Sequence, residues 1–440
     1  MTDTKKLRPR VRDAILQSLA AGVVPRIGQQ HIQVGRVHEV RALLKDIDRI
    51  ADGGSTMRFI IGEYGSGKTF FLHLIRSIAL ERKLVTAHAD LNPDRRIHAT
   101  GGQAQGLYQE LMRNLSTRSK PDGNALASVV ERFVTTAMQE AQSRKIEPES
   151  VIRSKLDVLT GLVGGYDFSE VVASYWRAHD TGDDALKANA VRWLRAEFTT
   201  KTAARKALGV RTIIEDSNTY DMLKLFARFV ELSGFGGLLI CLDELVNLYK
   251  LGSGRARRTN YEQILRILND SLQGGATPIG FLMGGTPEFL LDTRKGLYSY
   301  EALQTRLTEN SFARAGGLVD FSGPVLRLAN LAPEDLFVLL QKVRDIHAAG
   351  QAKPPHVPNE ALAAFMQHCS QRVGDAYFKT PRNTIVAFVH LLSTLEQNPT
   401  STWEALLNRV SIQSEHNPEL APLEDTSGDD DDDELADFKL

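Results

Sequence analysis

The chain of 440 residues is longer than one hydrophobic core usually organises, and its 42% hydrophobic content is enough to fill two or three domains. No stretch reaches the roughly 18 consecutive apolar residues of a membrane span, and the N-terminus lacks the apolar region of a secretory signal, so we expect a cytoplasmic protein with no membrane partner. Two cysteines, Cys241 and Cys369, are too few for a disulfide framework and are not spaced as zinc ligands.

The net charge of −1 hides an uneven distribution along the chain. Residues 424–440 hold 9 acids and 1 lysine, which leaves 52 bases against 45 acids, a net charge of +7, in residues 1–423. A basic body can bind polyanions by releasing their counterions, whereas a run of five aspartates repels itself and predicts a disordered acidic tail over residues 416–440. The tail is either a solubilising end or an electrostatic competitor for nucleic acid.

Five short apolar runs separated by helical patterns predict an α/β fold, with a parallel sheet covered by helices on both faces. The expected strands are residues 57–62, 84–91, 236–244, 277–288 and 324–331. Helical spacing precedes the first strand at residues 11–20, and it extends almost throughout residues 103–230, which predicts a long helical insertion between the second and third strands. Beyond residue 331 the pattern is helical to about residue 411, which predicts a separate all-helical domain.

A glycine-rich loop between the first strand and the next helix predicts a nucleotide-binding site. The sequence has the form G-x-x-x-x-G-K-T, and its glycines allow backbone N–H groups to approach phosphate oxygens closely. The lysine would reach the β- and γ-phosphates of ATP, and the threonine hydroxyl would bind Mg²⁺. The alternative is a chance glycine-rich turn. The residues expected to contact the nucleotide are Gly62, Glu63, Tyr64, Gly65, Ser66, Gly67, Lys68 and Thr69.

Two acids, Asp243 and Glu244, follow the apolar third strand, where carboxylates are costly to bury without a positive partner. A magnesium ion would supply that partner. We expect Asp243 to hold the ion, through water, and Glu244 to act as the general base for the attacking water. The alternative is an ordinary solvated strand end.

Thr286 follows the fourth strand, in the sequence GGTPE. Its hydroxyl could orient the attacking water or contact the γ-phosphate if that strand lies between the first and third. Alternatively, Gly284, Gly285 and Pro287 only shape a turn.

Two arginines are candidates for stabilising the charge that develops during phosphoryl transfer. Arg382 begins a helix of the all-helical domain, and Arg306 follows the fourth strand by one helix, where a neighbouring subunit could receive it. Either residue could instead be one of the many arginines that lie on protein surfaces.

With these motifs assembled, the chain resembles the AAA+ ATPases of the Orc/Cdc6-like branch. The segments GEYGSGKT, LICLDE, GGTPE and TPRN are similar to the Walker A, Walker B, sensor 1 and sensor 2 elements of that superfamily, in the same order. The segment HIQVGRVHEV is similar to the one that lies near adenine, which implies nucleotide contacts for Val34, Gly35 and Arg36. The resemblance implies an adenine-side region within residues 1–50, an ATPase core over 51–330 and a helical lid over 331–415.

A narrower resemblance is to the ATP-binding proteins of BREX phage-defence systems, of the BrxD-like kind. It is carried by IIGEYGSGKTFFLHLIR, HADLNPDRR, GLYQELMRNL and GGLLICLDELVNLYK. It implies a bacterial defence module, action on DNA, and partners such as a helicase or methyltransferase encoded alongside.

Charge placement also suggests contact with double-stranded DNA. One basic group is expected in a loop past the catalytic acids, where a ring would direct it toward its channel, and a second on a mobile N-terminal arm; both could instead be solvated surfaces. The residues are Arg255, Arg257 and Arg258 in the first group and Lys5, Lys6, Arg8, Arg10 and Arg12 in the second.

The leading hypothesis is an ATP-hydrolysing homo-oligomer, a ring or an open ring, that assembles on duplex DNA and completes its active site between subunits. The long insertion motivates a rival hypothesis, in which ATP gates a protein scaffold and the partner proteins handle the DNA. A third possibility is an origin or transposon helper of the same superfamily.

Overall fold

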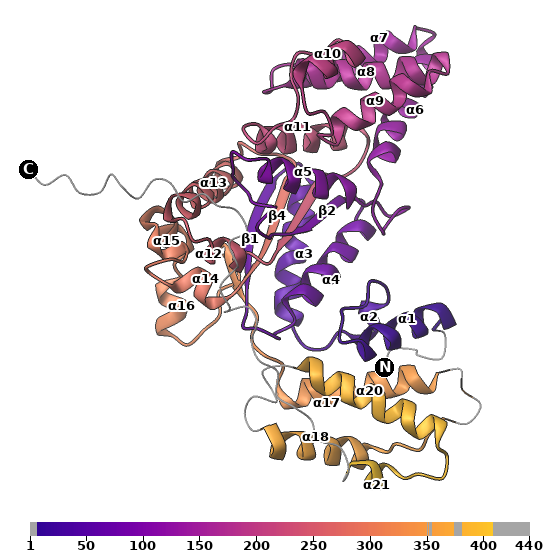
Figure 1. Ribbon diagram of the computed structural model, residues 1–440, viewed down its shortest axis with the longest axis vertical. Coiled ribbons are helices and arrows are strands. Elements are labelled where there is room, and N and C mark those ends of the chain that lie inside the picture. The colour runs from indigo at the N-terminus through magenta and orange to yellow at the C-terminus, as the bar shows by residue number, and fades with distance from the viewer. Residues whose placement is uncertain (1–6, 350, 352–353, 374–380, 408–440) are drawn as a thin grey trace, which may run out of the picture.

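The computed structural model describes residues 7–349, 351, 354–373 and 381–407. It is elongated, with a central sheet layer, a helical insertion at one end and a group of C-terminal helices, the lid, at the other (Figure 1). The acidic tail and the predicted DNA-contacting residues Lys5 and Lys6 lie outside the described residues. None of the described helices is both long and apolar enough to cross a membrane.

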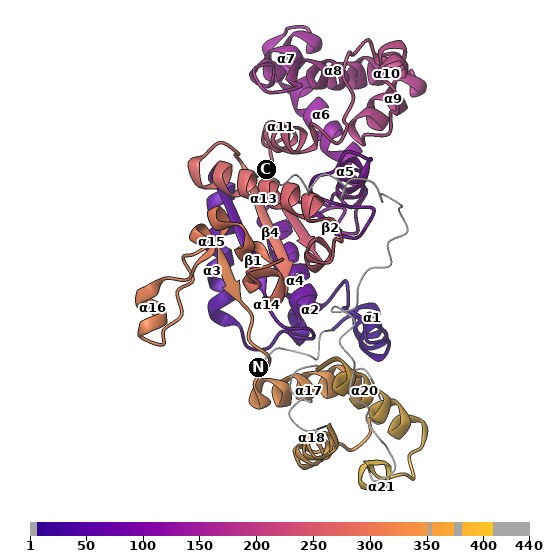
Figure 2. The same cartoon turned by 60° about the vertical axis from the view of Figure 1, so that its left-hand side comes forward.

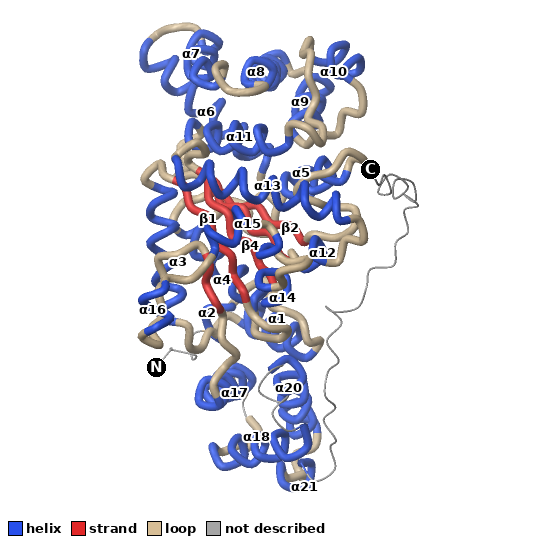
Figure 3. The backbone as a smooth tube through the Cα atoms, turned by 90° about the vertical axis from the view of Figure 1, so that its left-hand side faces the viewer, coloured by secondary structure: helices blue, strands red, loops and turns tan. Residues whose placement is uncertain are grey.

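In the part of the chain that the structure describes, five parallel strands form one sheet at the centre of the molecule (Figure 3). The strands are β1 Ser55–Ile61, β2 Val85–Asp90, β3 Leu238–Asp243, β4 Ile279–Gly285 and β5 Val325–Arg327. Their order across the sheet is β2-β3-β4-β1-β5, and every neighbouring pair is parallel. The predicted α/β fold with a five-stranded parallel sheet is therefore confirmed. The strand before Thr286 lies between the first and third strands, as the sensor hypothesis required.

Both faces of the sheet are buried, which explains why its strands are continuous apolar runs rather than alternating ones. On β1, Phe59 belongs to one buried cluster and Ile60 to another, because successive side chains point to opposite faces. The helices on the Ile60 face are α3 Val37–Ala51 and α4 Lys68–Glu81. The helices on the Phe59 face include α5 Gln103–Arg113, α11 Thr219–Leu232 and α13 Gly254–Gln273.

The predicted helical insertion is confirmed, and most of it stands away from the sheet at one end of the molecule (Figure 1). Its outer helices are α6 Leu126–Arg144, α7 Pro148–Leu156, α8 Gly165–Thr181, α9 Asp184–Leu194 and α10 Lys201–Leu208, with a short 3-10 turn, η2 Asp157–Leu159. The inner helices α5 and α11 join these to the sheet, and the buried cluster on the Phe59 face runs continuously through both layers.

The helices of the lid share their hydrophobic core with the N-terminal helix. The lid helices described are α17 Pro333–Ala348, α18 Asn359–Val373, α20 Pro381–Gln397 and α21 Trp403–Leu407. Ile15 and Leu19 of α1, Pro9–Ala20, are buried in the same cluster as Leu339 and Phe388. The short helix α2, Gln29–Ile32, also contributes to it.

The helix predicted over residues 11–20 is confirmed, but it begins at Pro9, so Arg10 and Arg12 of the predicted mobile basic arm belong to it. Pro9 begins α1, and the apolar face of that helix packs on α17 and α20. Arg12 is held to this layer because its Nη1 donates a hydrogen bond of 2.7 Å to the carbonyl of Ala349. Arg10 is exposed on α1, and Arg8 immediately precedes the helix.

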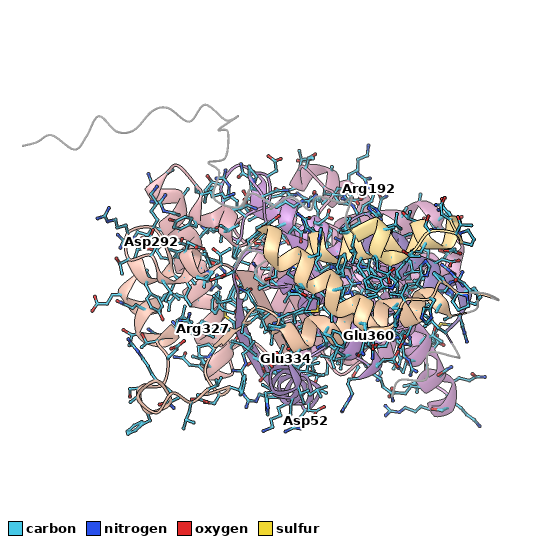
Figure 4. The ribbon with its side chains drawn as sticks, turned by 90° about the horizontal axis from the view of Figure 1, so that it is seen from below. Asp52, Arg192, Asp292, Arg327, Glu334 and Glu360 are labelled. Carbon is cyan, nitrogen blue, oxygen red and sulfur yellow. The ribbon has the colours of Figure 1, made fainter. Side chains whose placement is uncertain are left out.

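Several short helices follow β3 and β4 and form a separate side of the molecule. They are α12 Val246–Tyr249, α14 Pro287–Leu291, η3 Leu297–Ser299, α15 Glu301–Leu307 and α16 Ser311–Ala315. In a view from below, Asp292 lies on this side, whereas Glu334 and Glu360 lie on the lid (Figure 4). Helix α16 projects from the body (Figure 2), and Phe312 on it is 87% exposed.

Candidate nucleotide-binding site

The glycine-rich loop leaves the end of β1 and enters α4 with a backbone that requires glycine. Gly65 and Gly67 have φ angles of 77° and 84°, in the left-handed region. A Cβ added at Gly62 would lie 2.4 Å from Ser66 Oγ and 3.1 Å from the carbonyl oxygen of Leu328. The loop therefore folds tightly around the side chain of its own Ser66, and its backbone N–H groups lie at the start of a 14-residue helix.

Lys68 is buried at the first position of α4, and its ammonium group is held by the loop. Its Nζ donates hydrogen bonds of 3.0 and 3.1 Å to the carbonyls of Gly62 and Glu63. The loop therefore fixes the position of this positive charge beside the backbone amides. An anionic phosphate would find both kinds of donor in one place.

Thr69 and Asp243 meet directly, although they are 174 positions apart in the sequence. The Thr69 hydroxyl donates to Asp243 Oδ2 at 2.7 Å, and the backbone N–H of Glu244 donates to Asp243 Oδ1 at 2.9 Å. A hydroxyl and a carboxylate are oxygen ligands of the kind that Mg²⁺ binds. The side chains predicted to hold a magnesium ion are thus brought together.

Gly284 makes room for this carboxylate, a role that its sequence position, interpreted only as part of a turn, did not predict. A Cβ at Gly284 would lie 2.3 Å from Asp243 Oδ1. Its carbonyl also accepts a hydrogen bond of 3.0 Å from the N–H of Leu245, which holds the chain after the acids against β4. The only local signal was a glycine inside a buried strand, which indicates a close approach by another group.

Glu244 and Thr286 lie at the same edge of the sheet. Glu244 has a φ angle of 60°, unusual for a residue other than glycine, and it lines the cavity next to the loop. Thr286 is buried, and its hydroxyl oxygen accepts a hydrogen bond of 3.4 Å from the N–H of Phe289 at the start of α14. As an acceptor in that bond, the hydroxyl keeps its own proton for a second partner.

The loop faces a cavity of about 220 Å³ that lies between the sheet domain and the lid. One wall is the loop, from Tyr64 to Thr69, together with Glu244. The opposite wall is mainly apolar and combines three distant parts of the sequence, namely the chain around Val24 and Ile32, Leu331 and Leu339 of the lid, and Ile385 of α20. A polar wall facing an apolar one suits a ligand with phosphates at one end and a flat base at the other.

A comparison with protein families shows the family to which the chain belongs. Residues 7–411 match the family model described as BREX system ATP-binding protein BrxC/D. The chain belongs to this family. It is therefore an ATP-binding protein of a BREX defence system.

Two further comparisons do not bear on the family of this BREX protein. A solved structure, the Walker-type ATPase PABY2304 of Pyrococcus abyssi, is 12% identical over 86% of this chain and 71% of that chain, with a TM-score of 0.38. No curated protein matches the chain.

Arg36 lies between the glycine-rich loop and the lid of this BREX protein. Its guanidinium donates to the carbonyls of Ser66 and Ala329, while its Nη1 is buried without a hydrogen-bond partner. Burial lowers its pKa, although Glu39 and Asp335 oppose the shift. Ser66 Oγ is also buried without a partner, so two donors beside the loop fit an anionic ligand such as a phosphate.

The other two residues predicted to lie near adenine are Val34 and Gly35. Val34 lines the cavity, and Gly35 packs against the Asp335 carboxylate.

Arg382 and Arg306 occupy different surroundings. Arg382 lines the cavity at the start of α20, and its Nη1 donates to the Tyr64 hydroxyl at 3.5 Å. Arg306 is exposed on α15, where its Nη1 donates to the carbonyl of Ala302 at 2.8 Å, and it does not line the cavity. Within one chain, therefore, the structure brings Arg382 to the loop and leaves Arg306 on the outer surface.

The expected basic loop past the acids is the first turn of a helix. Arg255, Arg257 and Arg258 lie in α13, because the Ser253 hydroxyl accepts a hydrogen bond of 3.2 Å from the N–H of Ala256 and caps the helix at that point. Three arginines within four positions, with a glycine next to the first, were read as a loop, whereas Ser253 before that glycine was the helix-start signal.

A half-buried histidine pair that was not predicted from the sequence lies between α4 and β2. The rings of His73 on α4 and His88 on β2 make an edge contact with centroids 5.7 Å apart, and Arg76 Nη1 lies 2.6 Å from His88 Nδ1. Burial, reinforced by Arg76, lowers the pKa of His73 to about 4 and that of His88 to about 3. Both rings are therefore neutral at pH 7.

Asp90 also lies at this edge, beside Asp243 in the sheet register. Asp90 is exposed at the strand end, but partial desolvation by the surrounding protein and the negative charge of Asp243 still raise its pKa. The position of Asp90 at the end of the second strand was apparent from the sequence, but which strand lies beside it was not.

Proposed function

We propose that this BREX protein hydrolyses ATP with Mg²⁺ and acts on double-stranded DNA as a homo-oligomer, a ring or an open ring. The hydrogen bond between Thr69 and Asp243, with Glu244 adjacent, is the observation that carries the hydrolysis proposal. It joins the residue after the phosphate-binding lysine to the acid that ends the third strand, as a metal-bound triphosphate requires.

In the proposed mechanism, each residue of the chain has one task. The loop amides and Lys68 would bind the phosphate oxygens, and Thr69 and Asp243 would hold a magnesium ion, which would supply neutralisation of charge on those oxygens. Glu244 accepts the proton of the attacking water, and Thr286 orients that water. On the lid side, Arg382 places a guanidinium near the phosphates.

We assign Arg306 to the active site of a neighbouring subunit, because its exposed position leaves it accessible to one. An arginine supplied in this way can contribute roughly 10³- to 10⁵-fold in turnover. Arg306→Ala should then lose hydrolysis to that extent while ATP affinity stays within twofold. Unchanged turnover in this variant would remove Arg306 from the mechanism.

The decisive experiment for the proposed function combines mass photometry with an ATPase assay of the wild type and Glu244→Gln. The variant should bind ATP, assemble on duplex DNA and fail to release phosphate, because the carboxylate that accepts the proton is missing. The wild-type rate should rise when duplex DNA is added. Hydrolysis by the variant at the wild-type rate would contradict the role of Glu244, and no response to any nucleic acid would contradict the DNA role.

A second candidate function is a nucleotide-gated scaffold that recruits partners such as a helicase or methyltransferase. The far end of the insertion favours it, since Val158, Val163 and Tyr166 are 67%, 63% and 71% exposed there. The double substitution Val163→Asp and Tyr166→Ser should then abolish partner capture but spare ATP hydrolysis. Under the first function, the same change should leave DNA-stimulated hydrolysis and assembly intact.

A further inference from the structure

A basic cleft lies on the side of the molecule formed by α13, α14 and α15. It encloses about 510 Å³, and its charged lining residues are Arg257 and Arg258 from α13, Arg294 from the loop before η3, and Glu301 from α15. Three arginines and one carboxylate residue therefore line the cleft, which leaves it with an excess of positive charge. The arginine at 294 is new to the basic group, because it is 36 positions beyond Arg258 and no sequence pattern joins the two.

The loop that carries Arg294 is fixed by several contacts. Asp292 Oδ1 accepts hydrogen bonds from the N–H groups of Arg294 and Lys295 at 2.6 and 3.2 Å, and Tyr249 donates its hydroxyl to Asp292 Oδ2 at 2.9 Å. Tyr261, which extends from α13, donates its hydroxyl to the Lys295 carbonyl at 2.6 Å. These bonds hold the loop against α13, so the position of Arg294 opposite the helix is set by the fold.

Gly296 closes this loop at a point where no other residue fits. A Cβ there would lie 2.7 to 2.8 Å from the carbonyl oxygens of Phe289, Asp292 and Glu288. The glycine therefore permits the tight return of the chain that presents Arg294.

The helix side of the cleft is ordered as well. Arg257 is half-buried and donates to the carbonyl of Leu251, which precedes α13. Arg258 lies over the Tyr300 ring, 5.9 Å from its centroid, and its Nε donates to Glu262 at 3.2 Å. Because both members of the Arg258–Glu262 pair are exposed, the pair contributes little energy, and a phosphate could take the place of the carboxylate.

The chemistry of the cleft suits the phosphate groups of a nucleic acid backbone. Arginine forks match phosphate oxygens, and the first turn of the 20-residue α13 adds partial positive charge. An aromatic platform for unpaired bases is lacking among the residues that line it, since Tyr261 is buried and Arg258 covers a face of Tyr300. A duplex, whose bases are already stacked, presents only phosphates to such a surface.

We infer that the cleft between α13 and α15 binds the phosphate backbone of duplex DNA, with Arg258 and Arg294 as its principal contacts. This inference rests on the proposed function and deepens it by assigning the DNA contact to one rigid cleft rather than to a flexible loop.

Fluorescence anisotropy with a labelled duplex oligonucleotide, titrated at several salt concentrations, tests the assignment on the full chain. Arg294→Glu and Arg258→Glu should each weaken binding about tenfold and lower the salt dependence by about one phosphate contact. Arg294→Lys should keep most of the affinity, because it keeps the charge. Arg228→Glu is the matched control, since Arg228 pairs with Glu231 on the exposed side of α11, and it should stay within twofold.

The outcomes separate this inference from the proposed function. If the wild type binds duplex DNA and both cleft variants bind it with the same affinity and salt dependence, the cleft is not the DNA contact. The DNA would then bind to another surface of the protein. Equal or tighter binding of a single-stranded probe through the same arginines would overturn the duplex assignment. No wild-type binding to duplex DNA would overturn the inference together with the DNA part of the proposed function, while ATP hydrolysis measured without DNA would still report on the nucleotide site.

Discussion

The two walls of the nucleotide cavity are built by different physical means. One wall, here called the sheet wall, consists of the glycine-rich loop and Glu244, together with the strand ends that support them. It is fixed by backbone geometry and short polar contacts, as the Thr69–Asp243 hydrogen bond of 2.7 Å and the lack of space at Gly62 and Gly284 illustrate. The opposite wall, here called the lid wall, consists mainly of apolar side chains. Among them are Leu339 and Ile385, which pack in the separate hydrophobic core of the lid.

This difference separates two functions of the cavity. Small displacements in the sheet wall move groups that act on phosphate and metal, where an error of about 1 Å can cost roughly 100-fold in rate. Apolar contacts on the lid wall are non-directional and tolerate small shifts. We therefore expect the sheet wall to control the chemistry and the lid wall to control affinity and closure over the nucleotide.

Among changes that compare the two walls, the largest expected effect comes from adding one methyl group to the sheet wall. Gly284→Ala places a Cβ only 2.3 Å from Asp243 Oδ1, so the carboxylate must shift, which disturbs its hydrogen bond with Thr69. Hydrolysis should fall at least about 100-fold, equivalent to roughly 2.7 kcal/mol. Binding of ATP without Mg²⁺ should persist, and both quantities can be measured by phosphate release and by a fluorescent nucleotide.

Gly280→Ala is the matched control on the same strand. A Cβ at Gly280 would lie 2.3 Å from Ile50 Cδ1, an equally tight contact, but with an apolar side chain far from the acids. This variant should lose stability and keep its Mg²⁺-dependent rate. If the two variants lost the same share of activity at a temperature where both stay folded, the sheet wall would not have its special role.

The sheet wall was largely predictable from the sequence because its elements are local. A strand, a glycine-rich loop and a helix follow one another within residues 55–81. The apolar strand β3 ends at Asp243, and Glu244 follows it directly. The neighbouring relationship of Asp90 with Asp243, and the space at Gly284, depended on strand order, which spacing alone does not give.

The lid wall was less predictable because it joins the two ends of the chain. Helix α1 packs on α20, more than 360 positions later, and no periodicity in either helix names the other as its partner. For the same reason Arg294 was missed, since a single exposed arginine becomes part of a cleft only when the fold brings it opposite α13.

The histidine pair formed by His73 on α4 and His88 on β2 should make the folded protein less stable in acid. The unfolded chain binds protons at its histidines below about pH 6.5, whereas His73 and His88 keep pKa values of about 4 and 3 in the folded protein. Stability is therefore greatest above pH 6.5 and falls as the pH drops toward 4. Between pH 7 and pH 5 the loss should reach up to about 2 kcal/mol for each histidine, measured by urea unfolding.

His73→Gln should flatten this dependence by about 1 to 2 kcal/mol, because it removes one of the titrating groups. The groups around it, Arg76, Arg26 and Asp243, remain in place. His390, exposed on the lid helix α20, provides the matched control for substitution to glutamine. A wild-type protein equally stable at pH 5 and pH 7 would contradict burial of the histidine pair.

The smallest expected effect lies on the lid wall. Arg382→Ala removes the hydrogen bond to Tyr64 and the guanidinium that faces the loop. ATP affinity should fall about three- to tenfold, the range of one modest polar contact, with a smaller change for ADP if the guanidinium acts near the terminal phosphate. Titration of both nucleotides gives the comparison directly.

Arg344→Ala controls for loss of an arginine from the lid, because Arg344 bonds to Asn359 between lid helices and does not line the cavity. Arg382→Lys should recover part of the preference for ATP, since it restores a positive charge without the fork. Equal losses for ATP and ADP in Arg382→Ala would mean that the residue only holds the lid closed. A loss as large as that of Gly284→Ala would mean that the lid wall takes part in the chemistry, and the division of labour between the walls would then be wrong.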